Sequence, residues 1–510
     1  PLIPTCSGIL PVISSSRHAC GTSFFVLAPT LQFAIVVYAT YALSSNDLLY
    51  ERSHKMSNKN EVTLQRALGF WQSFGVSVGL VVAATTVVSL CNYFGSVGPA
   101  FIIPAGLSAF TCILIVLSYA ELSSAIPGAG MVVDYTLVAM GKTMSIFAMA
   151  AGYMVLISTA GACETFIAGM CAEEVFGINY KLFAGILVAI FMGINLIGVK
   201  ALGSSQIVLT SAKMATLALL GILGLLNVFT VSEPQSVEFM PFGWEPVITA
   251  MGGGIWLYIG IEYVCPLSEE IIQPEKNVPR AMIAGILTIF VVDMIFGEAL
   301  VRYVPLDVIA TSDVPQLVGA KAMFGTAGFV LLALATICSG ASAANSHMAS
   351  VPRMLYGLAR EGMLPRIFAY IHPRFRTPWA AIFLATACLS IPFFINVDIG
   401  SIMNFISMAC VAWLCSYIIV QIDLIILRKK YPKMHRPFRS PLFPVPQIIG
   451  IAICIWAIVT QTTSALIGAG VILVAFFVYA VIWVKFVMKE KCFRPVPFEE
   501  ISHINVKFDD

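Results

Sequence analysis

Two stretches of this sequence carry residues that suit the binding of a small polar molecule in apolar surroundings. The stretch Met251–Pro266 holds three successive glycines, then Gly260 and the carboxylate Glu262. A glycine inside a helix costs about 1 kcal/mol relative to alanine, so we expect the helix to break here. Gly75–Ser89, rich in small and hydroxyl side chains, is the candidate partner break. Backbone groups freed by such breaks bind solutes or ions in secondary transporters, although small residues also simply allow close helix packing.

Lys213 is the most informative single charge, because it lies inside the apolar stretch Ser204–Phe229, away from both ends. An ammonium group within a bilayer is costly and indicates a function or a partner. Three interpretations stay open. Lys213 could carry a proton, since a desolvated lysine releases its proton more readily; it could be a permanent charge with a structural role; or it could extend toward the water surface.

Other polar residues also lie within apolar stretches, and three of them are candidates for a pathway through the membrane. These are Glu164, Asn345 and His347. A histidine there could titrate near neutral pH. Each of the three could equally be hydrogen-bonded inside a helix bundle.

The composition shows which kind of protein must position these residues. Hydrophobic residues make up 59% of the 510 residues, and charged residues only 11%, against about 25% in soluble domains. A soluble chain of this size has too little polar surface to cover so many apolar side chains. A net charge of +2 leaves no basic face for nucleic acid. The cysteines are scattered without a Cys-x-x-Cys pair, so we expect core residues rather than disulfides.

Uncharged stretches of about 20 residues mark candidate membrane-spanning helices. Residues 67–120 suffice for two spans joined through Asn92–Pro99, and residues 440–484 for two more, divided near Gln461–Gly470. The other candidates are 377–397, 399–422, Thr143–Met170, Lys181–Lys200, Ser204–Phe229, Val247–Leu267, Met282–Val304 and Met323–Pro352. The chain is therefore expected to be an all-α polytopic membrane protein of about twelve helices, since the spans are too long for barrel strands.

The positive charges predict the orientation of these helices. With the N-terminus inside, the cytoplasmic loops hold nearly all lysines and arginines, and the opposite loops carry only Lys181, Arg302 and Lys321. We therefore expect both termini to be cytoplasmic. The short loops and the lack of an Asn-x-Ser/Thr sequon are typical of a bacterial inner-membrane protein.

Residues 1–55 precede the first methionine, Met56, which opens a polar stretch. Their apolar run near Ser23–Leu43 could be a signal peptide or an extra span. We expect instead that residues 1–55 come from a misplaced start and that Met56 begins the protein, because an extra span would give an odd number of helices. Residues 56–70 are then a cytoplasmic N-terminal segment, and residues 489–510 a cytoplasmic tail.

Three motifs resemble those of the amino acid–polyamine–organocation permeases, in particular the bacterial amino acid permeases. Tyr258–Glu262 followed by Ser268–Arg280 is similar to the sixth-helix signature of that family and its cytoplasmic exit. Arg353–Pro365 resembles the exit of the eighth helix, and Glu121–Gly130 the loop after the second. The motifs come in the family's order, and the resemblance extends from Leu64 to about Lys430.

The resemblance implies a leucine-transporter-type fold, with two inverted five-helix repeats in which helices 1 and 6 are discontinuous. The first repeat would cover residues 71–230, the second 245–426, and two more helices 440–488. It also implies a transporter that moves amino acids, polyamines or related amines by alternating access.

The substrate would then bind between the two breaks. N–H groups near Ala84–Thr86, at the N-terminus of a half-helix, would hold a carboxylate, and carbonyls around Tyr258–Gly260 would receive an ammonium. The family usually breaks helix 1 at Gly-x-Gly, whereas this chain has Ala83 and Thr85 at the matching positions. Their methyl groups should hinder the approach of a carboxylate, and threonine hydroxyls could bond instead. The expected substrate-binding residues are Ala83, Ala84, Thr85, Thr86, Trp256, Tyr258, Ile259, Gly260 and Glu262.

The resemblance suggests roles for individual side chains. Trp256 would cover the substrate from the outer side, unless it is an ordinary core residue. Glu262 would accept backbone hydrogen bonds at the break or, alternatively, contact a cationic substrate. Lys213 matches a lysine that some sodium-independent members carry where relatives bind sodium, so we expect no sodium dependence. Glu269 and Glu270 could pair with arginines of the eighth-helix loop as an inner gate, or form a solvated helix end.

Other classes of protein lack support in the sequence. There is no channel filter of the Thr-Val-Gly-Tyr-Gly type, and the zinc-binding pattern His-Glu-x-x-His does not occur, so we expect no enzyme, metal or cofactor. A substrate-binding sensor with a permease fold but no turnover stays open because of the first-helix departure. The expected partners are an amino acid or amine, the lipid bilayer and, as the coupling ion, protons.

Overall fold

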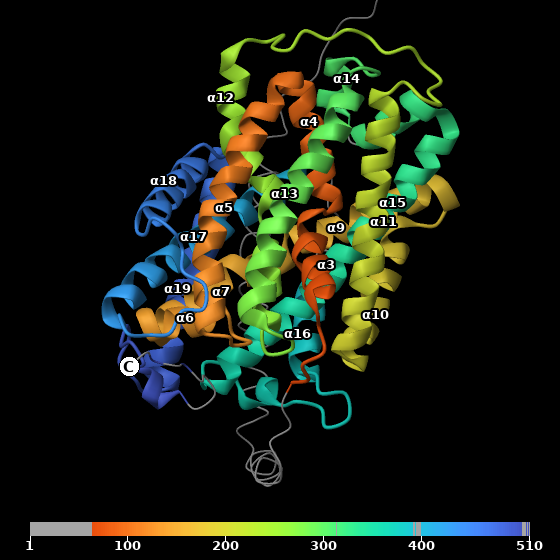
Figure 1. The fold of residues 1–510 in the computed structure, drawn as a ribbon. Coiled ribbons are helices and arrows are strands. Elements are labelled where there is room, and N and C mark those ends of the chain that lie inside the picture. The colour runs from red at the N-terminus through yellow and green to blue at the C-terminus, as the bar shows by residue number, and fades with distance from the viewer. Residues whose placement is uncertain are drawn as a thin grey trace, which may run out of the picture.

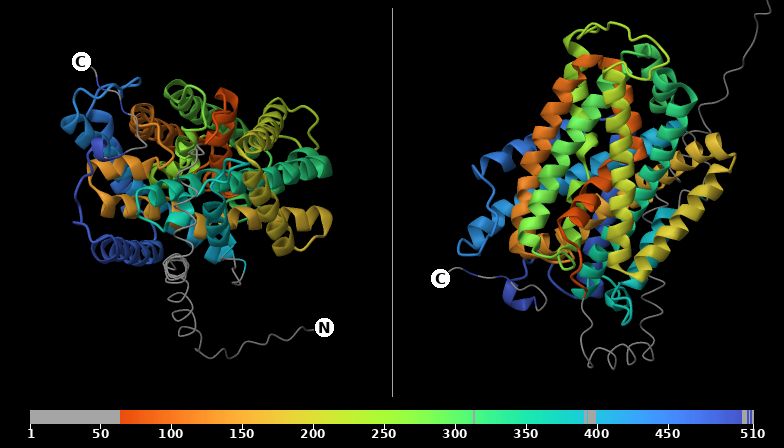
Figure 2. Two further views of the ribbon diagram at one scale, coloured as in Figure 1. Left: turned by 90° about the horizontal axis from the view of Figure 1, so that it is seen from below. Right: turned by 45° about the vertical axis from the view of Figure 1, so that its right-hand side comes forward.

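The computed structural model describes residues 64–312, 314–390, 393, 399–501, 506 and 508. Within them every named element is a helix, and β pairing is limited to two isolated bridges, between Leu68 and Ile271 and between Met434 and Phe508. The helices form one bundle in which most run roughly parallel or antiparallel to one another (Figure 1, Figure 2). The all-α prediction is confirmed, whereas the predictions for residues 1–63 lie outside the described residues.

Nine helices of the described residues are long and apolar enough to cross a bilayer, and the bent pair α3–α4 makes a tenth crossing. Two shorter apolar helices, α16 and α18, occupy the remaining predicted positions. In chain order the crossings are α3 (Phe70–Val81) with α4 (Ala84–Val97), α5 (Ile102–Ala125), α7 (Lys142–Met149) with α8 (Val155–Ser158) and α9 (Ala160–Phe176), α10 (Tyr180–Ile197), α11 (Val199–Leu225), α12 (Trp244–Gly253) with the 3-10 segments Gly254–Tyr258 and Ile261–Leu267, α13 (Pro274–Leu300), α15 (Pro315–Arg360), α16 (Trp379–Ser390), α17 (Ile399–Lys430), α18 (Val445–Val459) and α19 (Thr463–Ile482). Two short helices, α6 (Val132–Ala139) and α14 (Leu306–Thr311), lie between crossings.

Several helix boundaries differ from the predictions. The first crossing continues through Asn92 to Val97 and turns at Gly98, whose φ of 81° suits glycine. The division expected near Gln461–Gly470 is shorter, because α19 already begins at Thr463. Helix α15 has 46 residues and bends at Gly325 (φ 63°, ψ −148°), so it extends beyond both expected ends.

The first crossing is broken between α3 and α4, which meet at an angle of 57°. Val82 (ψ 46°) and Ala83 (ψ 164°) leave the helical region, and neither half-helix has a side-chain cap of its own at this point. No glycine or proline forces the break, so its free backbone groups must be satisfied by other helices. Those partners are described with the site below.

The sixth crossing is broken as the glycines predict. After α12 the chain follows a 3-10 turn, becomes extended at Ile259 (ψ 133°), and takes the left-handed conformation at Gly260 (φ 103°). A Cβ on Gly260 would lie 2.9 Å from Leu80 Cδ2 and 3.0 Å from Trp413 Cη2. Both the backbone angle and the space therefore require glycine there.

The third crossing is interrupted as well, which the sequence analysis did not predict. Ala150–Met154 form a π-helical turn, and Thr159 (φ −119°, ψ −84°) separates α8 from α9. The Thr159 hydroxyl donates to the Val155 carbonyl at 2.7 Å, so a side chain satisfies part of the disturbed backbone. Such irregular turns in helices often mark functional positions.

The segment before α3 is joined to the end of the sixth crossing by main-chain hydrogen bonds. The N–H groups of Ala67 and Leu68 donate to the Glu270 carbonyl at 2.8 and 3.0 Å, and Ile272 N–H donates to the Leu68 carbonyl at 2.8 Å. Higher up, the Ser77 hydroxyl donates to the Ile261 carbonyl at 2.5 Å. The lower halves of the two broken crossings are thus connected at two levels.

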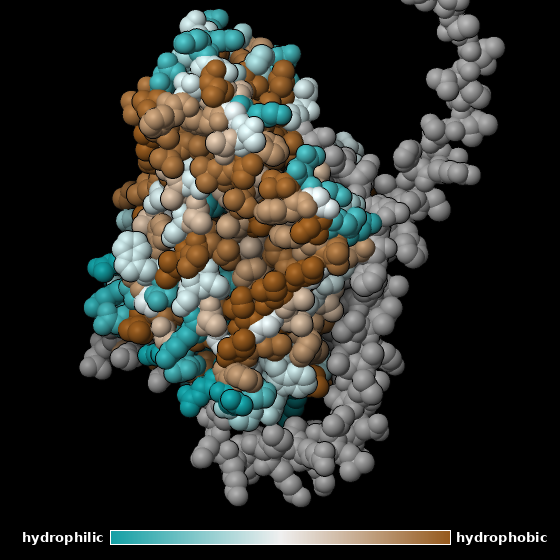
Figure 3. All heavy atoms as spheres, turned by 90° about the vertical axis from the view of Figure 1, so that its right-hand side faces the viewer, coloured by the Kyte–Doolittle hydropathy of each residue, from teal (hydrophilic) through white to brown (hydrophobic). Residues whose placement is uncertain are grey.

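The outer surface carries the apolar side chains expected of a protein in lipid. On the face shown in Figure 3, hydrophobic residues cover the middle and hydrophilic ones gather mainly toward the two ends. Large apolar side chains on α10, α18 and α19 are half exposed, among them Ile190 (53%), Ile448 (57%) and Val474 (64%). The acyl chains of lipid would cover such a surface favourably.

Candidate functional site

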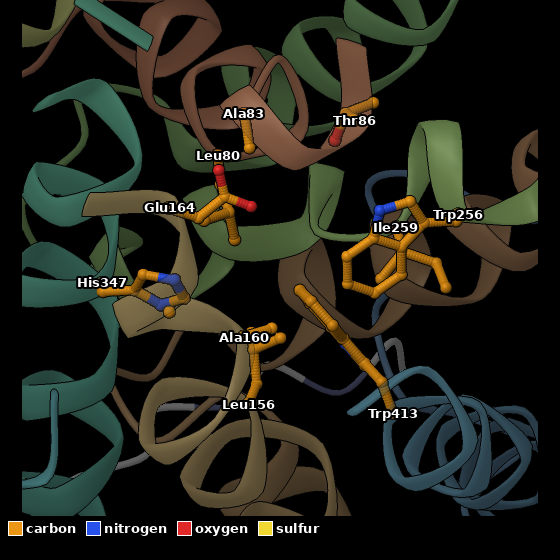
Figure 4. Close-up of a pocket in the computed structure, with 11 residues that line it drawn as sticks. Leu80, Ala83, Thr86, Leu156, Ala160, Glu164, Trp256, Ile259, His347 and Trp413 are labelled. Atoms are coloured by element: carbon orange, nitrogen blue, oxygen red, sulfur yellow. The ribbon is translucent and has the colours of Figure 1, made fainter. Parts of the chain in front are cut away.

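A small cavity of about 20 Å³ lies between the α3–α4 break, the interrupted third crossing and the break of the sixth crossing. In this conformation it has room for about one water molecule, so a larger ligand requires the surrounding helices to move apart. Figure 4 shows the indole rings of Trp256 and Trp413 facing the cavity from one side, and Glu164 and His347 from the other. Its wall is formed by Leu80, Ala83, Thr86, Leu156, Ala160, Gly161, Glu164, Trp256, Ile259, His347 and Trp413.

The wall brings together residues that the sequence analysis had chosen for separate reasons. Six of the predicted residues are on it: Ala83, Thr86, Glu164, Trp256, Ile259 and His347. The predicted residues that do not line it are Ala84, Thr85, Tyr258, Gly260, Glu262, Lys213 and Asn345.

Five wall residues were not predicted: Leu80, Leu156, Ala160, Gly161 and Trp413. The run of small residues from Thr159 to Ala162 could have indicated a close approach of backbone in the third crossing. Nothing in the sequence around Trp413 distinguishes it from an ordinary apolar core residue.

The N-terminus of α4 already holds a carboxylate, and it belongs to Glu164. The backbone N–H of Thr85 donates to Glu164 Oε2 at 3.1 Å, and the Thr85 hydroxyl donates to Glu164 Oε1. Glu164 is only 3% exposed, and the positive end of the half-helix dipole favours its negative charge. In this structure the Thr85 N–H therefore does not stand free for a substrate carboxylate, because a side chain from α9 occupies the position.

Two polar groups at the cavity have no partner among the described residues. The indole N–H of Trp256 is buried without a hydrogen bond. Thr86, which is 3% exposed, also makes no side-chain hydrogen bond, and its hydroxyl is directed toward the cavity in Figure 4. Buried polar groups are nearly always paired, so both are available to a ligand or to water.

Lys213 binds the other side of the α3–α4 break. Its Nζ donates to the Val82 carbonyl, to the Ala83 carbonyl at 2.9 Å and to the Ser339 hydroxyl at 2.6 Å. The Ser339 hydroxyl in turn donates to the Val82 carbonyl at 2.6 Å. Carbonyls at a helix C-terminus carry partial negative charge, so an ammonium stabilises the break. The interpretation that Lys213 extends to the water surface is wrong, since the residue is 3% exposed.

Glu262 holds the sixth crossing from behind the cavity. It is fully buried and accepts hydrogen bonds from Trp413 Nε1 at 2.8 Å, from the Tyr417 hydroxyl at 2.6 Å and from the Tyr153 hydroxyl at 3.2 Å. Tyr417 also accepts the Gly260 N–H at 3.2 Å. Glu262 is thus linked to the break through Tyr417, which binds the Gly260 N–H. The groups that donate to Glu262 from neighbouring helices are side chains and not freed backbone N–H groups.

Asn345 belongs to a polar network on the lower side of Lys213, away from the cavity. Its Nδ2 donates to Gln206 Oε1 at 2.7 Å, and its Oδ1 accepts from Asn195 Nδ2 at 2.9 Å. Gln206 continues to the Ser342 hydroxyl at 2.7 Å. These contacts join α10, α11 and α15, which surround α3. Asn345 is therefore hydrogen-bonded inside the helix bundle, which was the second of its two interpretations.

Ion pairs close the end of the bundle at which α3 begins. Glu270 pairs with Arg353 at 2.9 Å, with both side chains fully buried, and Glu269 pairs with Arg360 at 2.9 Å. Of the two alternatives, pairing describes both glutamates in this structure, although their arginines lie within α15 and not in the loop that follows it. No group of three metal-binding side chains occurs in the part of the chain that the structure describes.

Comparison with known proteins agrees with this architecture. The sequence profile of the family described as amino acid permease matches residues 68–488. The methylthioribose transporter of Bacillus subtilis (strain 168) is 26% identical over 404 residues, which cover 75% of this chain and 84% of the relative. The branched-chain amino acid permease BcaP of the same organism is 22% identical over 430 residues, covering 79% and 89%.

A solved structure supports the fold. The chain matches a crystal structure of a mutant manganese transporter of Eremococcus coleocola with a TM-score of 0.53, covering 84% of this chain and 99% of that one. At 12% identity the match shows the fold alone. The architecture is thus the leucine-transporter type, with discontinuous helices 1 and 6.

Proposed function

The chain belongs to the amino acid permease family, whose members are membrane transporters rather than enzymes, and we propose that it moves amino acids or related amines across a cytoplasmic membrane by alternating access. The observation that carries the proposal is the cavity between two helices broken at the same level. Discontinuous helices in transporters offer their freed backbone groups to a substrate near the middle of the bilayer. The two relatives described above include one named for an amino acid substrate and one for a thio-sugar.

We propose that transport does not depend on sodium. Freed carbonyls at a break are the groups that coordinate sodium in related folds. Here the ammonium of Lys213 binds the Val82 and Ala83 carbonyls together with the Ser339 hydroxyl. A metal ion placed among these oxygens would compete with a positive charge already bound there.

Proton coupling fits the same geometry, whether as symport or in exchange. Lys213 holds the carbonyl side of the α3–α4 break and Glu164 holds its N–H side. Among the titratable groups whose charge would act on Lys213 are Asp293, Glu164, Cys91 and Cys338. A proton gained or lost by Lys213 or by one of these neighbours would change the electrostatic interactions that hold α3 and α4 in place at the break. A permanent charge on Lys213 is the alternative.

We place the ion-paired end of the bundle on the cytoplasmic side, where the positive-inside rule puts its arginines. The Glu270–Arg353 and Glu269–Arg360 pairs then form the inner gate and have to separate when the cavity opens inward. Both termini would lie on this side.

The test is transport by the purified chain in liposomes. We expect counterflow of a labelled amino acid or amine that does not change when sodium is replaced by choline. The panel should contain amino acids, their amines and methylthioribose. If no compound of the panel is bound or transported, the proposal is overturned. Binding without flux would favour the sensor alternative.

A further inference from the structure

The contact between Glu164 and α4 restricts what the cavity can accept. A zwitterionic amino acid needs two complementary groups, a donor set for its carboxylate and an acceptor set for its ammonium. The donor set offered by Thr85 is engaged by Glu164, through the backbone N–H at 3.1 Å and through the hydroxyl. A ligand carboxylate must therefore displace Glu164 or bind elsewhere on the wall.

The rest of the wall offers no positive charge to a carboxylate. When His347 is neutral, Glu164 is the only charged residue on the wall. The nearest cation that the α3–α4 break contains, Lys213, does not line the cavity and has its ammonium engaged by two carbonyls and a hydroxyl. A carboxylate bound beside Glu164 would thus face a like charge in surroundings of low dielectric constant, which is strongly unfavourable.

The same wall is well suited to an organic cation. The carbonyl of Ile259, a wall residue, accepts no hydrogen bond from the described part of the chain, so it is a free acceptor. The indole rings of Trp256 and Trp413 face the cavity (Figure 4), and the face of an indole attracts an ammonium group. Glu164 adds the counter-charge from the opposite side.

We propose that this site selects amines that lack a carboxylate, and that Glu164 excludes α-amino acids by occupying the position of their carboxylate. The proposal rests on the transport function proposed above and names its substrate class. The ammonium lies between Glu164 and the carbonyl of Ile259, and the apolar part of the amine packs on Leu80 and Leu156 between the indole rings. The unpaired Thr86 hydroxyl and Trp256 N–H bind a hydroxyl or ether oxygen where the amine has one.

The experiment uses pairs of compounds that differ only in the carboxylate. The purified full chain in liposomes is tested by counterflow competition with leucine against 3-methylbutylamine, phenylalanine against phenethylamine, and lysine against cadaverine. We expect each amine to compete at a concentration at least tenfold lower than its amino acid. Amino acids that compete as well as or better than their amines would overturn the inference and leave the transport proposal intact.

The variant Glu164→Ala tests the assigned cause. With the carboxylate removed, Thr85 N–H becomes free, and we expect amino acids to gain and amines to lose apparent affinity, so that the preference changes by tenfold or more. Glu174→Ala, an exposed glutamate on the same helix, is the matched control and should keep the wild-type preference. An unchanged preference in Glu164→Ala would refute the role of Glu164, and a neutral compound favoured over every amine would refute the substrate class. If Glu164→Ala fails to fold, the wild-type comparison still decides.

Discussion

Replacing Gly260 by alanine tests the broken sixth helix most directly. With a φ of 103°, a residue with a Cβ is strained by about 1–2 kcal/mol. The new methyl group would also meet Leu80 Cδ2 at 2.9 Å and Trp413 Cη2 at 3.0 Å, and crowding in a packed interior costs about 1–3 kcal/mol. Alanine restricts the unfolded chain, which returns roughly 0.4–1 kcal/mol. The expected net loss is therefore about 1–5 kcal/mol.

Substitutions at two other glycines separate the effect of backbone strain from the effect of crowding by the new methyl group. Gly177 also has a positive φ of 68°, but nothing lies within 4 Å of a Cβ there, so Gly177→Ala carries the backbone strain without the crowding. Gly193 lies inside α10 with open space around its Cβ, and alanine is the better helix former. The assay is thermal unfolding of the purified protein in detergent, followed by tryptophan fluorescence. We expect Gly260→Ala to unfold well below Gly177→Ala, and Gly193→Ala at or above the wild type.

Equal unfolding temperatures for Gly260→Ala and Gly177→Ala would refute this reasoning. They would mean that Gly260 is not packed between Leu80 and Trp413, and hence that the sixth crossing does not break as described. Binding of a transported amine should fall in the same order, because the freed carbonyl of Ile259 depends on the same turn.

Three further substitutions test the surrounding contacts. Lys213→Ala should remove the pH dependence of flux if Lys213 carries the coupling proton; uptake at a series of pH values that parallels the wild type would contradict this. Glu262→Ala leaves the Trp413 N–H and the Tyr417 hydroxyl without their acceptor, at about 1–3 kcal/mol each, so its unfolding temperature should drop strongly and Glu262→Gln should recover part of the loss. Arg353→Ala leaves Glu270 buried without its partner and should cost about 3–5 kcal/mol, whereas Arg353→Met combined with Glu270→Met should restore most of the stability; a double variant no more stable than the single one would argue against the buried pair.

The features predicted correctly are those whose signal is local in the sequence. Spans can be read from uncharged runs, and the break at Gly260 from the glycines, because both depend on a residue and its near neighbours. The burial of Lys213 was predictable for the same reason, since it lies far from either end of an apolar run. Its binding partners were not, because Ser339 is 126 positions away in the chain.

The features that were missed depend on contacts between distant segments. The α3–α4 break has no glycine and is held by Lys213 and Glu164, which come from two other crossings. Sequence reasoning therefore placed the break correctly by resemblance but predicted free N–H groups where a side chain binds. The interruption at Thr159 and the position of Trp413 on the cavity wall were not predicted for a similar reason. Neither residue differs in type from its apolar or hydroxylated neighbours in the sequence.

The main-chain bonds between the segment at Ala67–Leu68 and the segment at Glu270–Ile272 have a consequence for how the transporter can diversify. Amide and carbonyl groups are the same in every residue except proline, so point substitutions with ordinary residues cannot remove this connection. A rocking movement that carries one inner half-helix must carry the other with it, whatever the side chains in the cavity. Selectivity can thus drift through changes at the wall while the moving unit stays mechanically the same.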